Sequence, residues 1–263
     1  MKLAIAGKGG VGKTTIAASL ALCLAEGGGA VLAIDADPTN NLASALGIPL
    51  SIAERIIPLS ERSDLIEERT GARPGTSGGY FRLNPKVDDL MEKLAVDHRG
   101  IKLAVMGTIR LGGGGCACAE NTLLRSFLAH LFLQPEESVV VDMEGGIEHL
   151  GRRTAENVSA MVVVVEPGQR SLAVAQKIRS LARDIGQERT LILGNKVRSA
   201  AEETLIRTLF PPEDILGFLP FDEEVRTADL QGLPPYEASA SFRERITEVV
   251  NRLNMIGNKI LTD

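Results

Sequence analysis

The sequence contains little sulfur and few large aromatic side chains: three cysteines, two tyrosines and no tryptophan among 263 residues. It also lacks a long apolar run, since none approaches the roughly 18 residues that a membrane-spanning helix needs. Gly7 ends the first apolar run too early for a signal peptide. We therefore expect a cytoplasmic protein without stable membrane insertion. In that reducing compartment, closely spaced cysteines indicate metal or redox chemistry instead of a structural disulfide.

The sequence also has no excess of basic residues. The chain has 34 Asp and Glu against 29 Lys and Arg, which gives a formal net charge of −5. This balance argues against general affinity for nucleic acid or anionic lipid. The hydrophobic fraction of 44% and the charged fraction of 24% are ordinary for a globular protein. The length suffices for one large domain with a buried core.

Short apolar segments rich in Val, Ile and Leu alternate with helical stretches. Such segments are typical of strands buried on both faces of a parallel sheet, and they lie at 2–6, 30–35, 101–107, 138–143, 160–166, 190–195 and 215–220. Helices are predicted between them, for example over 14–26, 120–133, 171–185 and 201–210. This alternation predicts an α/β fold: a doubly wound, mostly parallel sheet with helices on both faces and ligands at the carboxyl ends of the strands. We expect one domain over residues 1–263.

Residues 51–100 interrupt this alternation. They contain charged helical pieces and a glycine-rich loop, and we expect no strand there. An insertion of this length is usually functional or mobile. Two interpretations remain open: a solvated cover over the sheet edge, or a docking surface for a protein partner.

The segment GKGGVGKTT (7–15) fits the P-loop pattern G-x-x-x-x-G-K-[ST]. Its glycines allow backbone N–H groups to surround phosphates, and the following helix directs its positive end at them. Lys13 would neutralise phosphate charge, and the Thr14 hydroxyl would bind Mg²⁺. The predicted nucleotide-binding residues of this loop are Gly9, Gly10, Val11, Gly12, Lys13, Thr14 and Thr15.

The additional lysine Lys8 gives the loop the form KGGVGKTT, which resembles the deviant Walker A motif of the MinD, ParA and nitrogenase-iron-protein superfamily, in the SIMIBI class of P-loop NTPases. The resemblance implies that Lys8 reaches the phosphates of a partner subunit in an ATP-dependent homodimer. It also implies that Asp37, which precedes a proline in switch I, orients or deprotonates the attacking water. Lys8, Lys13 and Asp37 are therefore the predicted catalytic residues. Asp142 ends the apolar strand VVVDM and is the predicted Walker B carboxylate, which would hold Mg²⁺ through water.

The identity of the base follows from the segment LGNKVR (193–198). It resembles the guanine motif N-K-x-D, but Arg198 stands where guanine recognition requires an aspartate, and a cation cannot accept the guanine N–H protons. ATP and ADP are therefore the expected nucleotides. Asn195 is the candidate for contacting adenine, as its counterpart does in the superfamily, and the loop that begins at Pro220 would form the other wall.

Two of the three cysteines, Cys116 and Cys118, lie one residue apart behind four glycines. In an extended loop both thiolates could face one metal ion, but Zn²⁺ needs about four ligands and no nearby His or Cys supplies the others. A twofold axis between two chains would complete the set. The alternative is a pair of inert buried thiols. Cys23, inside the first helix, is predicted to lie in the core.

The segments RLNPKVDDL, AVMGTIRLGGGGCACAEN and VVDMEGGIEHLGR, together with the P-loop, resemble the CooC family of ATPases, which help to install nickel in carbon monoxide dehydrogenase. The resemblance covers residues 1 to about 230. It implies that Cys116 and Cys118 bind Zn²⁺ or Ni²⁺ at a dimer interface, and that a nucleotide-switched metallochaperone serves a client nickel enzyme. That client would be carbon monoxide dehydrogenase or acetyl-CoA synthase.

Two other functions are compatible with the sequence. A nitrogenase-iron-protein-like electron carrier would hold an iron–sulfur cluster between its subunits, and four thiolates suit such a cluster. A MinD- or ParA-type positioning ATPase would act on membrane or DNA. The helical spacing of Ile246, Val249, Val250, Leu253 and Ile256 near the C-terminus is found in membrane-targeting helices, but it also suits a helix that packs on a sheet, which we favour.

Overall fold

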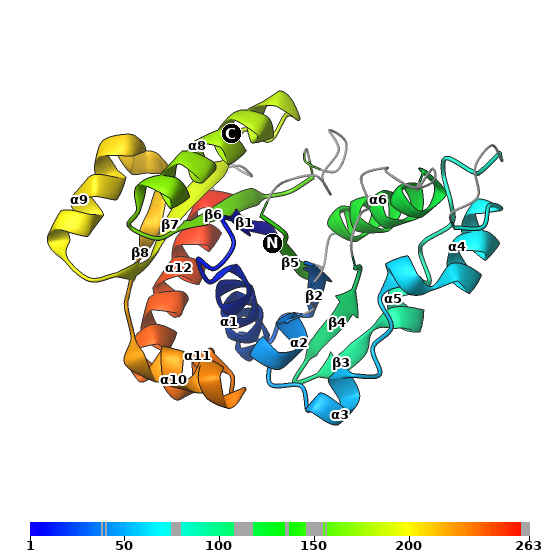
Figure 1. Ribbon diagram of the computed structural model, residues 1–263, viewed down its shortest axis with the longest axis horizontal. Coiled ribbons are helices and arrows are strands. Elements are labelled where there is room, and N and C mark those ends of the chain that lie inside the picture. The colour runs from blue at the N-terminus through cyan, green and yellow to red at the C-terminus, as the bar shows by residue number, and fades with distance from the viewer. Residues whose placement is uncertain are drawn as a thin grey trace.

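The computed structural model describes residues 1–37, 39, 41–74, 80–107, 118–134, 137–145, 155 and 157–258. Its centre is an eight-stranded sheet with the order β3-β4-β2-β5-β1-β6-β7-β8 (Figure 1). The strands are β1 (Lys2–Gly7), β2 (Val31–Ala36), β3 (Val96–His98), β4 (Ile101–Val105), β5 (Ser138–Met143), β6 (Ala160–Val165), β7 (Thr190–Val197) and β8 (Ile215–Pro220). All neighbouring strands are parallel except β3 and β4. The predicted doubly wound fold and all seven predicted strands are confirmed.

Helices cover both faces of the sheet (Figure 1). In chain order they are α1 (Lys13–Glu26), α2 (Leu42–Ala45), α3 (Leu50–Ala53), α4 (Ser63–Thr70), α5 (Leu90–Leu94), α6 (Cys118–Leu133), α8 (Gln169–Asp184), α9 (Ala200–Leu209), α10 (Glu223–Gln231), α11 (Pro235–Ala238) and α12 (Ala240–Asn258). Short 3-10 helices lie at Leu59–Glu61 and Pro212–Asp214. The four predicted helices correspond to α1, α6, α8 and α9, and each predicted end lies within two residues of the observed end.

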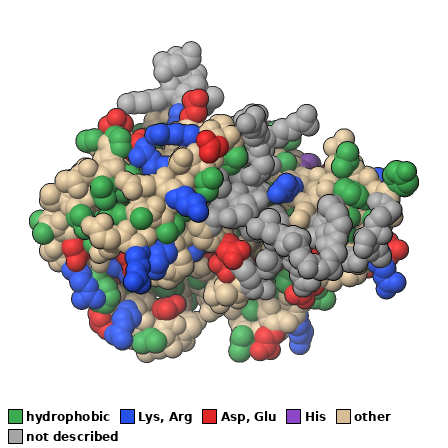
Figure 2. All heavy atoms as spheres, turned by 45° about the horizontal axis from the view of Figure 1, so that its top comes forward, with side chains coloured by type: hydrophobic (Ala, Val, Ile, Leu, Met, Phe, Trp, Pro, Cys, Tyr) green, Lys and Arg blue, Asp and Glu red, His purple; other side chains and the backbone are tan. Residues whose placement is uncertain are grey.

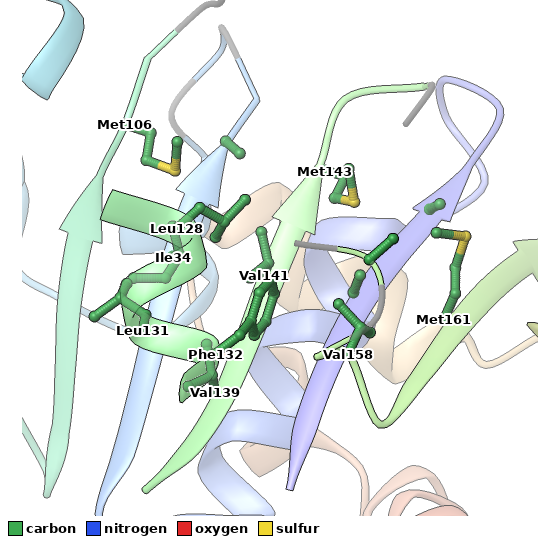
Figure 3. Packing of buried hydrophobic residues seen from close by; sticks show 14 of the residues in the cluster. Ile34, Met106, Leu128, Leu131, Phe132, Val139, Val141, Met143, Val158 and Met161 are labelled. Carbon is green, nitrogen blue, oxygen red and sulfur yellow. The ribbon is translucent and has the colours of Figure 1, made fainter. Parts of the chain in front are cut away.

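The strand side chains divide between two apolar layers because successive residues of a strand point to opposite faces. Val139 and Val141 of β5 belong to the layer under α6 and α8, and Val140 belongs to the layer under α1 and α12. Figure 3 shows the first layer, in which Phe132 of α6 lies beside Val139 and Val141. A sheet that is buried on both faces in this way holds its strand ends rigidly, and these ends carry the site.

We predicted no strand between residues 51 and 100, and this prediction is wrong. Val96–His98 forms the edge strand β3, which pairs antiparallel with β4 through the partners His98 and Ile101. The two residues between the strands, Arg99 and Gly100, both have positive φ, at 52° and 79°. This is the backbone of a type I′ hairpin turn, which a two-residue loop favours. The rest of the described insertion is α3, α4, α5 and connecting loops.

The C-terminal helix α12 packs on the sheet, as favoured from the sequence. Ile246, Val249, Val250 and Leu253 are buried in the layer that also contains α1, and Ile256 packs against its edge. Cys23 was predicted to be in the core, but it is only half-buried at the border of this layer, where its Sγ lies 3.8 Å from Thr247 Oγ1. None of the helices in the described ranges is both long and apolar enough to cross a membrane.

Candidate functional site

A pocket of about 680 Å³ lies at the carboxyl ends of β1, β2, β7 and β8. One end is formed by the loop between β1 and α1, and its lining residues are Gly9, Gly10, Gly12, Lys13, Thr14 and Thr15. The other end is lined mainly by Asn195, Lys196, Pro220, Phe221 and Asp222. A cavity of about 720 Å³ lies elsewhere, between Met1, Arg189 and α12, but no P-loop residue lines it. The first pocket is the candidate site because ligands of doubly wound sheets bind at the carboxyl ends of the strands.

The loop between β1 and α1 has a backbone that only glycine can supply at two points. Gly7 has φ +144°, and a Cβ there would lie 2.4 Å from the Val164 carbonyl oxygen. Gly12 has φ +95°, and a Cβ there would lie 2.6 Å from Asn195 Nδ2. These are the two glycines that the P-loop pattern fixes. The loop is thus folded tightly between β6 and β7, and its backbone faces the pocket without intervening side chains.

Helix α1 begins at Lys13, directly under this loop. Its first turn reads Lys-Thr-Thr-Ile, so no acidic side chain neutralises the positive end of the helix. Lys13 is only 6% exposed and lines the pocket. A helix N-terminus with free N–H groups beside a buried lysine is a binding site for phosphate.

Two of the predicted P-loop residues lie outside the pocket lining. Val11 is fully buried in the core, and its N–H lies 3.4 Å from the Lys8 carbonyl oxygen. Lys8 is not among the lining residues, and its Nζ lies 3.5 Å from the carbonyl oxygen of Gly9, which lines the pocket. Val11 therefore shapes the loop through packing, and Lys8 is half-exposed at the rim.

Thr14 lines the pocket and contacts Asp142, a buried residue that is not part of the lining. The Thr14 hydroxyl donates to Asp142 Oδ2 at 2.6 Å. Asp142 is fully buried, and within the described part of the chain no hydrogen-bond donor reaches its other oxygen, Oδ1. Burial raises its pKa to about 7, with a further contribution from the charge of Asp35, while Thr14 and Lys13 oppose the shift. A hydroxyl and a buried carboxylate with a free oxygen fit Mg²⁺, which prefers such ligands.

Asp35 and Asp37 lie at the end of β2, next to Asp142. Asp35 is the register partner of Asp142 on the neighbouring strand. Its two oxygens accept the N–H groups of Asp37 and Leu42, so Asp35 holds the turn after β2 instead of facing a ligand. Burial raises its pKa to about 6. Asp37 lines the pocket and accepts both the N–H and the hydroxyl of Thr39 on Oδ1.

At the opposite end of the pocket, β7 and β8 supply the wall. Asn195 is buried and donates from Nδ2 to the Val11 carbonyl at 2.8 Å, so it links β7 to the P-loop. Pro220 ends β8, and Phe221 follows it in the lining. The Arg198 guanidinium lies 3.9 Å from the centroid of the Phe221 ring. Asn195 was predicted to contact adenine, and the loop that begins at Pro220 was predicted to form the other wall. Phe221 is the next residue of that loop and was not named individually.

Asp222 caps the next helix, α10, and accepts three hydrogen bonds within the protein. Its Oδ1 accepts the N–H groups of Glu224 and Val225 at the start of α10, and its Oδ2 accepts the Ser239 hydroxyl at 2.5 Å. The Asp222 carboxylate therefore serves the structure of this wall.

The predicted metal ligands Cys116 and Cys118 lie outside the described residues, except that the backbone of Cys118 begins α6. Among the residues that the structure does describe, no group of three or more His, Cys, Asp and Glu side chains is arranged to hold a metal ion.

Figure 2 shows the molecule turned toward the carboxyl ends of the strands. On the coloured part of this face, acidic and basic side chains lie beside one another. The described surface in that view has no continuous basic band of the kind that tracks a nucleic-acid backbone.

The sheet, the tight glycine loop and the helix that starts under it define a P-loop nucleotide-binding protein. The chain belongs to the CobQ/CobB/MinD/ParA nucleotide-binding domain family, and the sequence model of that family matches residues 2–236. It is accordingly a P-loop ATPase, as predicted.

Relatives match over nearly the whole chain. The carbon monoxide dehydrogenase accessory protein CooC of Rhodospirillum rubrum is 46% identical over 93% of this chain and 93% of its own length. An uncharacterised ATP-binding protein of Methanocaldococcus jannaschii is 44% identical over 98% of this chain and 99% of its own length. The predicted resemblance to CooC proteins is confirmed.

Solved structures share the fold at low identity. The MinC:MinD cell division complex of Aquifex aeolicus gives a TM-score of 0.66 at 22% identity, covering 96% of this chain and 95% of the other. MinD of Pyrococcus horikoshii, solved with Mg-ADP, gives a TM-score of 0.66 at 18% identity, covering 96% and 95%.

Proposed function

We propose that this chain is an ATP-hydrolysing, nucleotide-switched, dimeric metallochaperone that serves the maturation of a nickel enzyme. The observation that carries the proposal is the 46% identity to the CooC accessory protein over 93% of both chains. It is supported by a pocket that is lined by the phosphate-binding loop and by Thr14, whose hydroxyl contacts the buried Asp142 carboxylate.

The residues around the pocket have distinct roles in this proposal. Lys13 and the N–H groups at the start of α1 bind the phosphates, while Thr14 and Asp142 hold Mg²⁺. The ion would neutralise the charge that develops during phosphoryl transfer. Asp37, at the mouth of the same pocket, orients the attacking water. These roles require positioning more than covalent chemistry, which is what phosphoryl transfer demands.

Adenine is the base that we propose for the wall formed by β7 and β8. Guanine recognition needs a carboxylate that is free to accept two N–H protons. Asp222 is held by its bonds to the start of α10 and to Ser239, and Arg198 stacks on Phe221. Asn195 remains the polar side chain beside the base, and Pro220 and Phe221 supply an apolar wall.

Self-association completes the site in this proposal. Lys8 lies at the rim and does not line the pocket of its own chain. It is therefore available to the phosphates of a second copy, and bound ATP would favour the homodimer. The Cys116 and Cys118 thiolates of both copies would then meet on the twofold axis and bind one Zn²⁺ or Ni²⁺. The proposed client is carbon monoxide dehydrogenase or acetyl-CoA synthase.

The test measures metal content and oligomeric state with ATP, with ADP and without nucleotide. Wild type is compared with the double variant Cys116→Ser/Cys118→Ser and with Cys23→Ser, a matched control at a cysteine in α1. We expect about one ion per two chains in wild type and in the control, and loss of the ion with intact ATP binding in the double variant. Unchanged metal content in the double variant would contradict the metal site.

The client is tested by producing each nickel enzyme together with wild type or with the double variant and measuring its nickel content. We expect wild type, but not the double variant, to raise the nickel content of its client enzyme. Visible absorption of the anaerobically purified protein would instead indicate an iron–sulfur electron carrier. ATP-dependent pelleting with anionic liposomes would indicate a positioning ATPase.

A further inference from the structure

Strand β7 contains an irregularity beside the P-loop. Its pairing with β8 shifts register between Gly194 and Val197. Lys196, inside this bulge, has φ 57°, one of two positive values among the described non-glycine residues. The left-handed backbone is unfavourable for a residue with a Cβ, and an outlier of this kind tends to be retained where it serves a site.

The bulge gives two consecutive side chains the same direction. In a regular strand, successive side chains point to opposite faces. Here Asn195 Nδ2 donates to the Val11 carbonyl at 2.8 Å, and Lys196 Nζ donates to the Gly10 carbonyl at 2.6 Å. Two adjacent residues of β7 therefore hold two adjacent carbonyl groups of the P-loop.

This part of the P-loop has few other attachments. A Cβ built on Gly9 or Gly10 meets nothing within 4 Å, and both glycines are exposed. Val11 is the first residue of the segment that is anchored in the core. Lys196 thus attaches the exposed stretch to β7, whereas the contact of Lys8 Nζ with the Gly9 carbonyl at 3.5 Å stays within the loop. The Lys196 ammonium is balanced by Glu166 Oε2 at 3.6 Å.

The hydrogen bonds from Asn195 and Lys196 also fix the orientation of the peptide groups that they hold. A trans peptide group points its carbonyl and its N–H to opposite sides. When β7 holds the carbonyls of Gly10 and Val11, the N–H groups of Val11 and Gly12 turn away from β7. Gly12 lines the pocket, and its N–H belongs to the peptide group whose carbonyl Asn195 holds.

We propose that Lys196 is a positioning residue which, together with Asn195, holds the P-loop in its phosphate-binding form. The inference rests on the proposed nucleotide site. Lys196 lines the pocket, but its ammonium is held by the Gly10 carbonyl and lies beside Glu166. In this proposal it acts through the loop, so it strengthens the binding of every nucleotide that fills the phosphate cradle.

The test uses two substitutions at this position. Lys196→Asn removes the ammonium but keeps a residue that tolerates a left-handed backbone. Lys196→Arg keeps a cationic donor. The control is Arg99→Asn at the other non-glycine residue with positive φ, at 52°, whose side chain pairs with Glu237 and does not line the pocket.

Affinities for Mg-ADP and Mg-ATP are measured by titration calorimetry, and KM and kcat by phosphate release. We expect Lys196→Asn to weaken both nucleotides equally, by about 5- to 10-fold, as the loss of one charged hydrogen bond implies. KM should rise by the same factor, with kcat within about 3-fold of wild type. Lys196→Arg should bind within about 3-fold of wild type, and Arg99→Asn should bind as wild type does.

Wild-type affinity of Lys196→Asn for ADP would overturn the inference. A loss confined to ATP would overturn it too, since it would mean direct contact with the terminal phosphate, and a changed preference between ATP and GTP would mean contact with the base. A lower urea midpoint without the rise in KM would assign Lys196 to general stability and also overturn it. Wild-type protein that binds neither nucleotide would instead contradict the proposed function.

Discussion

Asp142 makes the nucleotide-free protein less stable than its fold allows. The carboxylate is fully buried and faces the charge of Asp35 across β2 and β5. From the described residues it receives one hydrogen bond, donated by Thr14. Ionised carboxylates without full compensation are costly in such surroundings. We predict that Asp142→Asn stabilises the protein in the absence of nucleotide and Mg²⁺, because the amide keeps an acceptor for Thr14 but carries no charge.

The magnitude follows from the pKa, which burial raises from the ordinary 3.8 to about 7. A shift of this size corresponds to about 4 kcal/mol at a pH where the folded protein is ionised. Between pH 4 and 7 the folded state binds a proton that the unfolded chain has released, so wild-type stability falls as pH rises through this window. The amide side chain introduced by Asp142→Asn is also desolvated on burial, and this cost offsets part of the gain in the free energy of unfolding. We therefore expect Asp142→Asn to add about 2 to 4 kcal/mol at pH 8 and much less at pH 5.

Urea unfolding of wild type and Asp142→Asn at pH 5, 6, 7 and 8 measures this difference. The exposed Asp97 on β3 provides the control, and Asp97→Asn should change stability by less than about 0.5 kcal/mol at every pH. Mg-ATP should stabilise wild type strongly and Asp142→Asn weakly, because the variant lacks the carboxylate proposed for Mg²⁺. A variant that is destabilised at pH 8, or whose advantage is the same at pH 5 and pH 8, would refute the reasoning.

Two further substitutions test the architecture of the pocket. Gly12→Ala should abolish nucleotide binding and destabilise the fold by about 2 kcal/mol or more, because the new Cβ would lie 2.6 Å from Asn195 Nδ2 at φ +95°. Gly168→Ala, where a Cβ meets nothing within 4 Å, is the control, and equal losses in both variants would exclude the proposed cause. Asp222→Ala should cost about 1 to 2 kcal/mol in urea unfolding and weaken ATP binding, because Asp222 caps α10 with two accepted N–H groups. Ser199→Ala at α9, a cap with one such bond, should cost less and leave ATP binding unchanged, and the reverse order would show that the cap of α10 is unimportant.

The part of the fold that could be predicted consists of elements whose signal is local. A strand buried on both faces must be apolar throughout, so an apolar run such as AMVVVV of β6 predicts a strand directly from the sequence. The edge strand β3 has no such run, since two of its three residues are only half-buried and Asp97 is exposed. It exists because Arg99 and Gly100 turn the chain back onto β4, and no apolar pattern encodes that turn.

The candidate site divides in the same way. The P-loop and Asp142 could be predicted because glycine spacing and a carboxylate at a strand end are local features with a direct physical meaning. The position of Lys196 depends on a bulge in β7, and that of Phe221 depends on where β8 ends beside β7. The inward turn of Asp35, which serves two N–H groups instead of a ligand, also requires the fold, because the sequence places it only two residues from Asp37.

The two buried carboxylates suggest how nucleotide binding reaches the rest of the molecule. Asp35 and Asp142 are register partners at the ends of neighbouring strands, and burial raises the pKa of both, to about 6 and about 7. A divalent cation bound at Asp142 would offset the repulsion between them, so ionised Asp35 would become more favourable and would hold the N–H groups of Asp37 and Leu42 more strongly. The turn after β2, which carries Asp37, would then be firmer with Mg-ATP than without it. In this way, the charge that we expect to lower stability without nucleotide would also make the proposed switch respond to nucleotide.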